Sequence, residues 1–230
     1  GGRVSGKFAD GALEVGMTAI HEGGSAVASG QESQLYGVDL TWQISEETQV
    51  RAEYATTDTN QPGAASTVGD ALFLEMVHQA DDLAVTAYLR EENTGFGLGQ
   101  TRSNTEDIRR VGVTGSYRLS QTDEAESGER TTRSINGDVY REENLSTGEY
   151  RESAAVGFLQ SAETLQFETG LRFANEHLSD GEHRNSVLVT GAAQKQFVEH
   201  GLTVSVHHEE PLNQQNMVSL FPKRTVLGVD

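Results

Sequence analysis

The run His207-His208-Glu209-Glu210 contains the residue types best suited to metal binding in this chain of 230 residues. Imidazole nitrogen and carboxylate oxygen both bind zinc, and a site needs at least three such protein ligands. Adjacent residues of a strand face opposite sides, so only His207 with Glu209, or His208 with Glu210, could share one ion. Polar strand ends explain the run more simply. We therefore predict no metal site, with His207 and Glu209 as the weak candidates.

The segment Gly95-Phe96-Gly97-Leu98-Gly99 has the glycine spacing of a phosphate-binding loop. Such loops bind anions because a helix begins directly after them, and the polar stretch that follows here shows no helix start. We interpret the segment as a flexible loop tip. No nucleophile elbow, catalytic triad spacing or paired-carboxylate signature stands out either. The sequence predicts a protein that is not an enzyme, without catalytic residues or an organic cofactor.

The composition is acidic and contains few hydrophobic residues. The formal net charge is −18, from 35 acidic and 17 basic residues, and hydrophobic residues make up 35% of the chain. Nucleic-acid binding needs a basic face, so we exclude it. The absence of cysteine excludes disulfides and thiolate metal sites. A structure with one polar, wet face accommodates this composition better than a large packed core does.

Residues 38–54 form an amphipathic hairpin pattern. Val38, Leu40 and Trp42 alternate with polar residues, and Val50-to-Tyr54 repeats the alternation after the polar break Ser45–Thr48. Side chains of a strand point to opposite faces with a period of two, so each arm has one apolar and one charged face. The apolar face could pack against a second sheet, or it could face lipid.

The same alternation continues along most of the chain and places about a dozen strands. Short polar turns at Ser45–Thr48, Ala80–Asp82 and Ser161–Thr164 alternate with longer, Gly- and Ser-rich loops such as Asp58–Gly69. The short turns recur at about 35 to 42 residues, the length of one hairpin plus one long loop. We predict an all-β, antiparallel up-and-down fold in a single region, residues 1–230. The final segment Thr225–Asp230 resembles only the start of a strand, so we expect a fragment of a longer chain.

The hairpins Val38–Tyr54, Leu83–Tyr117 and Leu165–Phe173 resemble the transmembrane β-barrel regions of Gram-negative outer-membrane proteins. The resemblance covers most of the chain. It rests on the alternation of apolar and polar residues and on the spacing of the turns, without a signature motif. It implies a porin-like barrel, or part of one, in the bacterial outer membrane, which acts as a pore, channel or membrane anchor. Its partners would be outer-membrane lipid and lipopolysaccharide. The alternative is a soluble or cell-surface β-sandwich that serves as a binding or adhesion module.

In the barrel interpretation the two faces of the strands have different surroundings. Both faces stay patterned through many strands, which favours the barrel over a sandwich. The predicted lipid-facing residues are Val38, Leu40, Trp42, Ile44, Tyr54, Leu83, Val85, Tyr117, Phe167 and Phe173. The predicted lumen-facing residues are Asp39, Arg51, Glu53, Glu75, Arg90, Arg110, Arg118, Glu168 and Arg172.

Acidic pairs recur in the loops and at strand ends, for example Glu91-Glu92, Glu106-Asp107, Glu142-Glu143 and Glu209-Glu210. Hard cations prefer carboxylate oxygens. One hypothesis is that Ca²⁺ or Mg²⁺ bridges these pairs to lipopolysaccharide phosphates. Solvated loop charge is the simpler explanation.

Overall fold

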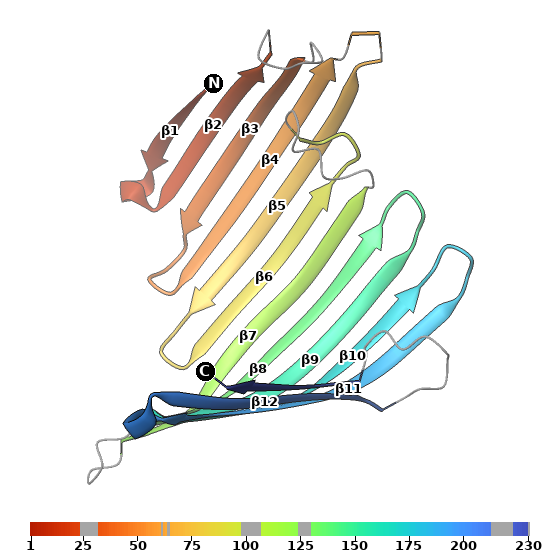
Figure 1. Ribbon diagram of the computed structural model, residues 1–230. Helices are drawn as coiled ribbons and strands as arrows, with labels where there is room; N and C mark the ends of the chain where they lie inside the picture. The colour runs from red at the N-terminus through yellow and green to blue at the C-terminus, as the bar shows by residue number, and fades with distance from the viewer. Residues whose placement is uncertain are drawn as a thin grey trace. The chain divides into compact units, whose positions relative to one another are not determined.

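The computed structural model is an antiparallel all-β structure of thirteen strands that follow one another in chain order (Figure 1). It describes residues 1–23, 32–60, 62–63, 65–97, 107–123, 130–212 and 223–229. The predicted all-β, up-and-down architecture is confirmed. No helix in this described part of the chain is long and apolar enough to cross a membrane.

Each strand from β2 to β12 is hydrogen-bonded to the strand before it and the strand after it. Two 3₁₀ turns, η1 (Ala9–Gly11) and η3 (Val198–His200), join neighbouring strands. The strands are β1 (Gly2–Phe8), β2 (Leu13–Glu22), β3 (Glu32–Gln43), β4 (Thr48–Asn60), β5 (Thr67–Gln79), β6 (Leu83–Glu92), β7 (Ile108–Asp123), β8 (Arg130–Asn144), β9 (Tyr150–Ser161), β10 (Leu165–His177), β11 (His183–Phe197), β12 (Leu202–Pro211) and β13 (Arg224–Val229).

The strands are more numerous and longer than the sequence predicts. The alternation missed β1, because its sequence GRVSGKF holds two glycines and only two large apolar residues. Strand β8 also extends through the polar run Arg141–Asn144. Pairing continues there because the ladder uses backbone groups and does not require apolar side chains.

The chain divides into two compact units. Unit 1 contains residues 1–79, 86–112 and 142–148, and unit 2 contains residues 80–85, 113–141 and 149–230. At the two ends of the strand order, β1 pairs only with β2 and β13 only with β12, among the residues described. The sheet is therefore not closed into a barrel.

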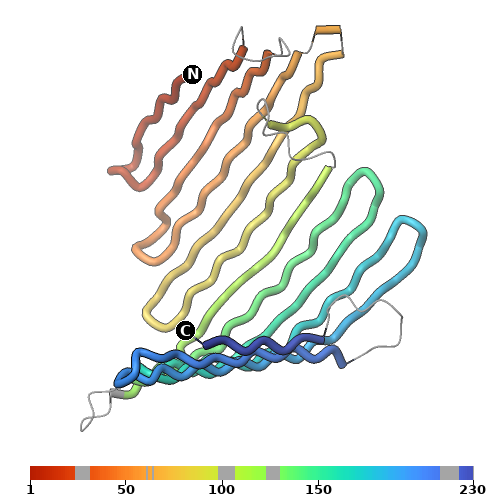
Figure 2. The backbone as a smooth tube through the Cα atoms, viewed as in Figure 1, coloured from red at the N-terminus to blue at the C-terminus, as the bar shows by residue number. Residues whose placement is uncertain are grey.

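The predicted short turns are confirmed. Strand β3 ends at Gln43 and β4 begins at Thr48, and the turn is closed by a hydrogen bond from the Ile44 amide to the Thr48 carbonyl, 2.9 Å long. Ala80 and Ala162 make equivalent 2.8 Å bonds in the β5–β6 and β9–β10 turns. Figure 2 shows these tight hairpins in the tube view. The connection between β10 and β11 is also short: the five-residue turn Leu178–Glu182 is closed by a 3.0 Å bond from the Leu178 amide to the Glu182 carbonyl.

The register of β1–β5 puts apolar side chains in rows on one face of unit 1. One row pairs Val4 with Met17, Met17 with Val38, Val38 with Tyr54, and Tyr54 with Leu72. A second row runs through Val15, Leu40, Ala52 and Leu74, and a third through Phe8, Leu13, Trp42, Val50 and Met76. The opposite face carries the row Asp39–Glu53 and the row Lys7–Glu14–Thr41–Arg51–Glu75.

Unit 2 shows the same division in β9–β13. Phe167 lies in a row with Gln160, Ala193, Val206 and Leu227. Phe173 lies on the same face of β10, because six residues separate the two rings. Residues Glu168 and Arg172 lie on the opposite face of that strand. Each unit therefore has one apolar face and one polar face, which we call by those names below.

Candidate functional site

The apolar face carries large side chains that remain exposed. On unit 1, Val4 is 69% exposed, Met17 59% and Trp42 47%. On unit 2, Phe173 is 49% and Leu227 76% exposed. Among the described residues, the buried apolar side chains are Ala174, Leu188 and Pro211, and all three lie on the polar face. The described residues therefore form no hydrophobic core on the apolar side of either unit.

In the strands β3, β4 and β10, the predicted lipid-facing residues fall on this face. Val38, Leu40 and Trp42 pair with Tyr54, Ala52 and Val50, and Phe167 and Phe173 share their face of β10. Ile44 lies just past the end of β3 and is 49% exposed. Leu83 and Val85 are two residues apart on β6 and therefore share a face of that strand. Tyr117 on β7 is 51% exposed. Contact of these side chains with lipid remains a prediction.

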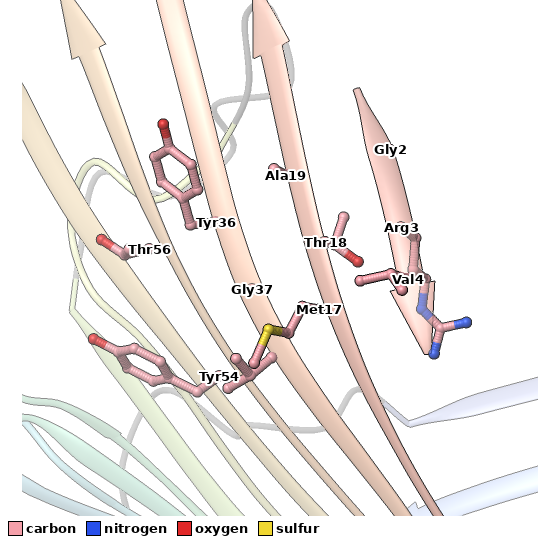
Figure 3. A pocket seen from close by; sticks show the side chains of 11 residues that line it. Gly2, Arg3, Val4, Met17, Thr18, Ala19, Tyr36, Gly37, Tyr54 and Thr56 are labelled. Atoms are coloured by element: carbon pink, nitrogen blue, oxygen red, sulfur yellow. The ribbon is translucent and has the colours of Figure 1, made fainter. Parts of the chain in front are cut away.

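A shallow hollow of about 620 Å³ lies on the apolar face of unit 1 (Figure 3). Ala19 and the backbone of Gly37 form its floor, and Tyr36, Tyr54 and Met17 rise around it. The Tyr54 hydroxyl donates to Asp70 at 3.0 Å, and the Tyr36 hydroxyl donates to Gln34 at 2.9 Å. Each ring thus presents an apolar body and a satisfied polar tip, the combination that suits a membrane–water boundary.

Ion pairs cross the polar face of unit 1. The Arg3 guanidinium binds the Asp39 carboxylate at 2.5 Å, above Gly16, which has no side chain to displace them. Arg51 lies 3.3 Å from Glu53 and 3.6 Å from Glu75. Asp39, Arg51, Glu53 and Glu75 thus share one face, as their alternation indicates. Whether that face lines a lumen remains a prediction.

The remaining basic residues predicted for the lumen each have an acidic neighbour. Arg90 binds Glu92, and Arg110 lies 3.8 Å from Glu142 and stacks over the Tyr88 ring at 6.0 Å. Arg118 lies 3.5 Å from Asp82. These pairs are solvated, so each contributes at most about 1 kcal/mol to stability. Together they give the polar face a surface of alternating charge.

A second hollow, of about 440 Å³, lies on the polar face of unit 2. Gly157 and Gly170 are paired directly across β9 and β10, and the Asn136 and Thr190 side chains occupy the space that side chains at these two positions would fill. Glu168 and Arg172 stand on either side of Gly170 along β10, and Arg172 lies 3.7 Å from Asp138. The structure thus brings the predicted residues Glu168 and Arg172 to one water-accessible depression with opposite charges at its two ends.

The weak metal candidates His207 and Glu209 do lie on one face, with the imidazole nitrogen 3.2 Å from the carboxylate. The guanidinium of Arg224 also binds Glu209, at 3.1 Å. A cation beside the carboxylate opposes a second cation by charge repulsion. Within the described ranges, no group of three metal-binding side chains comes together.

The interpretation of Gly95–Gly99 as a flexible loop tip missed the packing of Gly95–Gly97. Leu98 and Gly99 lie outside the described residues. Residues Thr94–Gly97, which we call the inner segment, lie against the polar face of unit 1. The Thr57 hydroxyl is completely buried, donates to the Gly95 carbonyl at 3.3 Å and accepts from the Gly97 amide at 3.2 Å. A Cβ atom on Gly69 would overlap the backbone of Phe96. Glycine at both contact points is the one sequence signal that could have indicated this approach.

Asp107 fixes the other side of the inner segment. Its carboxylate accepts from the Ser146 hydroxyl at 2.6 Å, and from the backbone amide and the hydroxyl of Thr94. These hydrogen bonds, led by that of Ser146, lower the pKa of Asp107 from its ordinary value. The carboxylate therefore ties the inner segment to the turn between β8 and β9.

Acid should release this tie. Because the folded-state pKa of Asp107 is lowered, its stabilisation is present above the unfolded-state value of about 3.9 and is lost as pH falls through the folded value. We expect the wild-type protein to have a higher urea midpoint than Asp107→Asn at neutral pH. The difference should shrink below about pH 4. A difference that stays constant between pH 7 and pH 2 would contradict the assignment.

Two comparisons with known proteins gave no relative. No protein-family model matches the chain, and no curated protein matches it.

Proposed function

We propose that the chain is a β-barrel region of a bacterial outer-membrane protein and acts there as a pore, channel or membrane anchor. In this proposal the apolar face contacts lipid, and the polar face lines a water-filled path. Lipid and lipopolysaccharide are the partners of the outer surface.

The observation that carries the proposal is the inverted distribution of burial. Large apolar side chains such as Trp42 and Met17 are about half exposed, whereas the completely buried side chain of Thr57 lies on the polar face. A water-soluble protein of this size gains most of its stability from an apolar core. A lipid bilayer supplies that apolar environment from outside.

The spacing of the aromatic residues also supports the proposal. Tyr36 and Trp42 lie on the same face of β3, six residues apart. At about 3.3 Å per residue they are roughly 20 Å apart along the strand, which a tilt of about 35–45° reduces to roughly 15 Å of height, within the apolar band of about 25 Å of outer-membrane barrels. Aromatic residues gather at both edges of such bands.

The alternative function, a β-sandwich binding module, requires a second sheet over the apolar face. The exposed fractions of Val38 (48%) and Phe167 (44%) argue against such a cover in either unit. A sandwich would also place its apolar side chains in a core about 10 Å thick between the sheets.

Closure of the sheet belongs to the proposal. Strands β1 and β13 would each need a second neighbour. The thirteen described strands are an odd number, so β1 and β13 would run parallel if they paired directly, and an all-antiparallel barrel would need a further strand between them.

Detergent dependence tests the proposal. We expect the purified chain to fold only in detergent micelles or lipid vesicles. It should also migrate differently on gels before and after heating, because closed barrels resist unfolding by the gel detergent. Folding as a monomer in plain buffer, with no heat-dependent migration, would favour the sandwich instead.

A chelator tests the cation hypothesis. Glu91 is bound by Arg109 at 2.8 Å and Glu210 by Lys223 at 2.7 Å, so these carboxylates already have basic partners. We therefore expect EDTA to lower the melting temperature by less than about 2 °C, the equivalent of under ~1 kcal/mol for a chain of this size. A larger shift that Ca²⁺ or Mg²⁺ reverses would show that the acidic pairs bind a structural ion.

A further inference from the structure

The inner segment is held in place by more contacts than its loop sequence suggests. It follows the last residues of β6 and reaches back over β5 to β4, where it meets Gly69 and Thr57. Gly95 is itself buried, with a backbone φ of 90° that disfavours other residues. All of these residues belong to unit 1.

The side on which the segment lies follows from the register. Thr57 pairs with Leu35 and Gly69, and alternation along β4 puts Thr57 on the same face as Arg51 and Glu53. The Thr57 hydroxyl contacts the Gly95 carbonyl and the Gly97 amide. The segment therefore covers the polar face near the ends of β4 and β5, and leaves the apolar face free.

We propose that the inner segment narrows the mouth of the polar path and limits the size of the solutes that pass, an inference that rests on the channel function proposed above. The path near Thr57 is then bounded by the backbone of Gly95–Gly97 and by the half-buried Phe96 ring. The inner segment is held on one side by its contacts with Thr57 and Gly69. On the other side it is held by Asp107, which is itself bound by Ser146. These contacts keep the boundary of the path at one width.

The decisive variant is Thr57→Val. Valine keeps the shape of threonine but leaves the Gly95 carbonyl and the Gly97 amide without their partner, so the segment should leave the polar face. Thr41→Val is the matched control. It makes the same chemical change on the same face, at a hydroxyl that has no hydrogen-bond partner among the described residues.

Position and function are measured separately. Hydrogen exchange of the peptide that contains residues 94–97, in detergent micelles, reports whether the segment stays in place. Single-channel conductance in planar bilayers, with neutral polyethylene glycols of increasing size, reports the width of the path. In Thr57→Val we expect faster exchange, a rise in conductance of roughly twofold, and entry of larger polymers, because conductance follows pore diameter.

The outcomes separate this inference from the function on which it rests. Faster exchange with wider passage in Thr57→Val, and wild-type behaviour in Thr41→Val, supports the inference. Faster exchange with unchanged conductance and polymer cut-off overturns it but leaves the channel function standing. A wild-type protein that folds in lipid yet conducts no ions overturns the channel function itself, and the inference with it.

Discussion

Replacing Leu40 with arginine is expected to lower the free energy of unfolding in lipid vesicles by about 2–4 kcal/mol, the effect of a cationic side chain at mid-depth on the lipid face of a barrel. Leu40 lies in the middle row of the apolar face, between Val15 and Ala52. Urea titration of vesicle-inserted protein, followed by tryptophan fluorescence, measures the change. Trp42 is the only tryptophan of the chain and reports from the same face.

Two further variants give this prediction its specificity. Thr41→Arg places the same charge one residue away, on the polar face between Glu14 and Arg51, and should change stability by less than about 1 kcal/mol, because attraction to Glu14 offsets repulsion from Arg51. Tyr36→Arg places it on the apolar face near the end of the band, where the effect should fall to about 0–1 kcal/mol. Equal losses of stability at Leu40 and Tyr36 would show that the cost of the charge does not depend on its position along the strand. That result would contradict a bilayer around this face, where the cost falls from the midplane to the interfaces.

The second large effect is expected at Gly69. Gly69→Ala should destabilise the protein by about 1–3 kcal/mol, the usual range for adding atoms where no space exists. The added methyl group would overlap the backbone nitrogen of Phe96. Backbone cannot swing aside as the end of a flexible side chain can, so the inner segment must move. Urea unfolding in detergent measures the loss.

Gly37→Ala is the control for this substitution. Gly37 lies on the same face, within a strand, and a Cβ atom there would meet its neighbours at an ordinary 3.5 Å. Alanine in place of glycine should leave stability unchanged or raise it by up to about 1 kcal/mol, because alanine loses less backbone entropy on folding. Equal destabilisation by the two substitutions would argue that Phe96 does not lie against Gly69.

The sequence predicted the two faces of the hairpins and the positions of their tight turns, because the signals for both are local. The alternation from Val38 to Tyr54 is enough to divide the hairpin into two faces, and the polar run Ser45–Thr48 is enough to place its turn. It failed where the signal is weak: β1 is short and glycine-rich, and pairs with β2 through backbone groups. Phe73 illustrates the other failure, since it lies on the polar face opposite Glu53 although its side chain is apolar.

What the sequence by itself determined is the antiparallel all-β class and the two unlike faces, because a period of two is a property of each strand alone. Only the tertiary structure decided the register, and with it the ion pair of Arg3 with Asp39, which lies 36 residues away in the chain. It also decided that the inner segment turns onto the polar face, because the contact needs Gly69 and Gly95 to meet without side chains between them. No periodicity encodes which two glycines will face each other. That information exists only once the strands have paired.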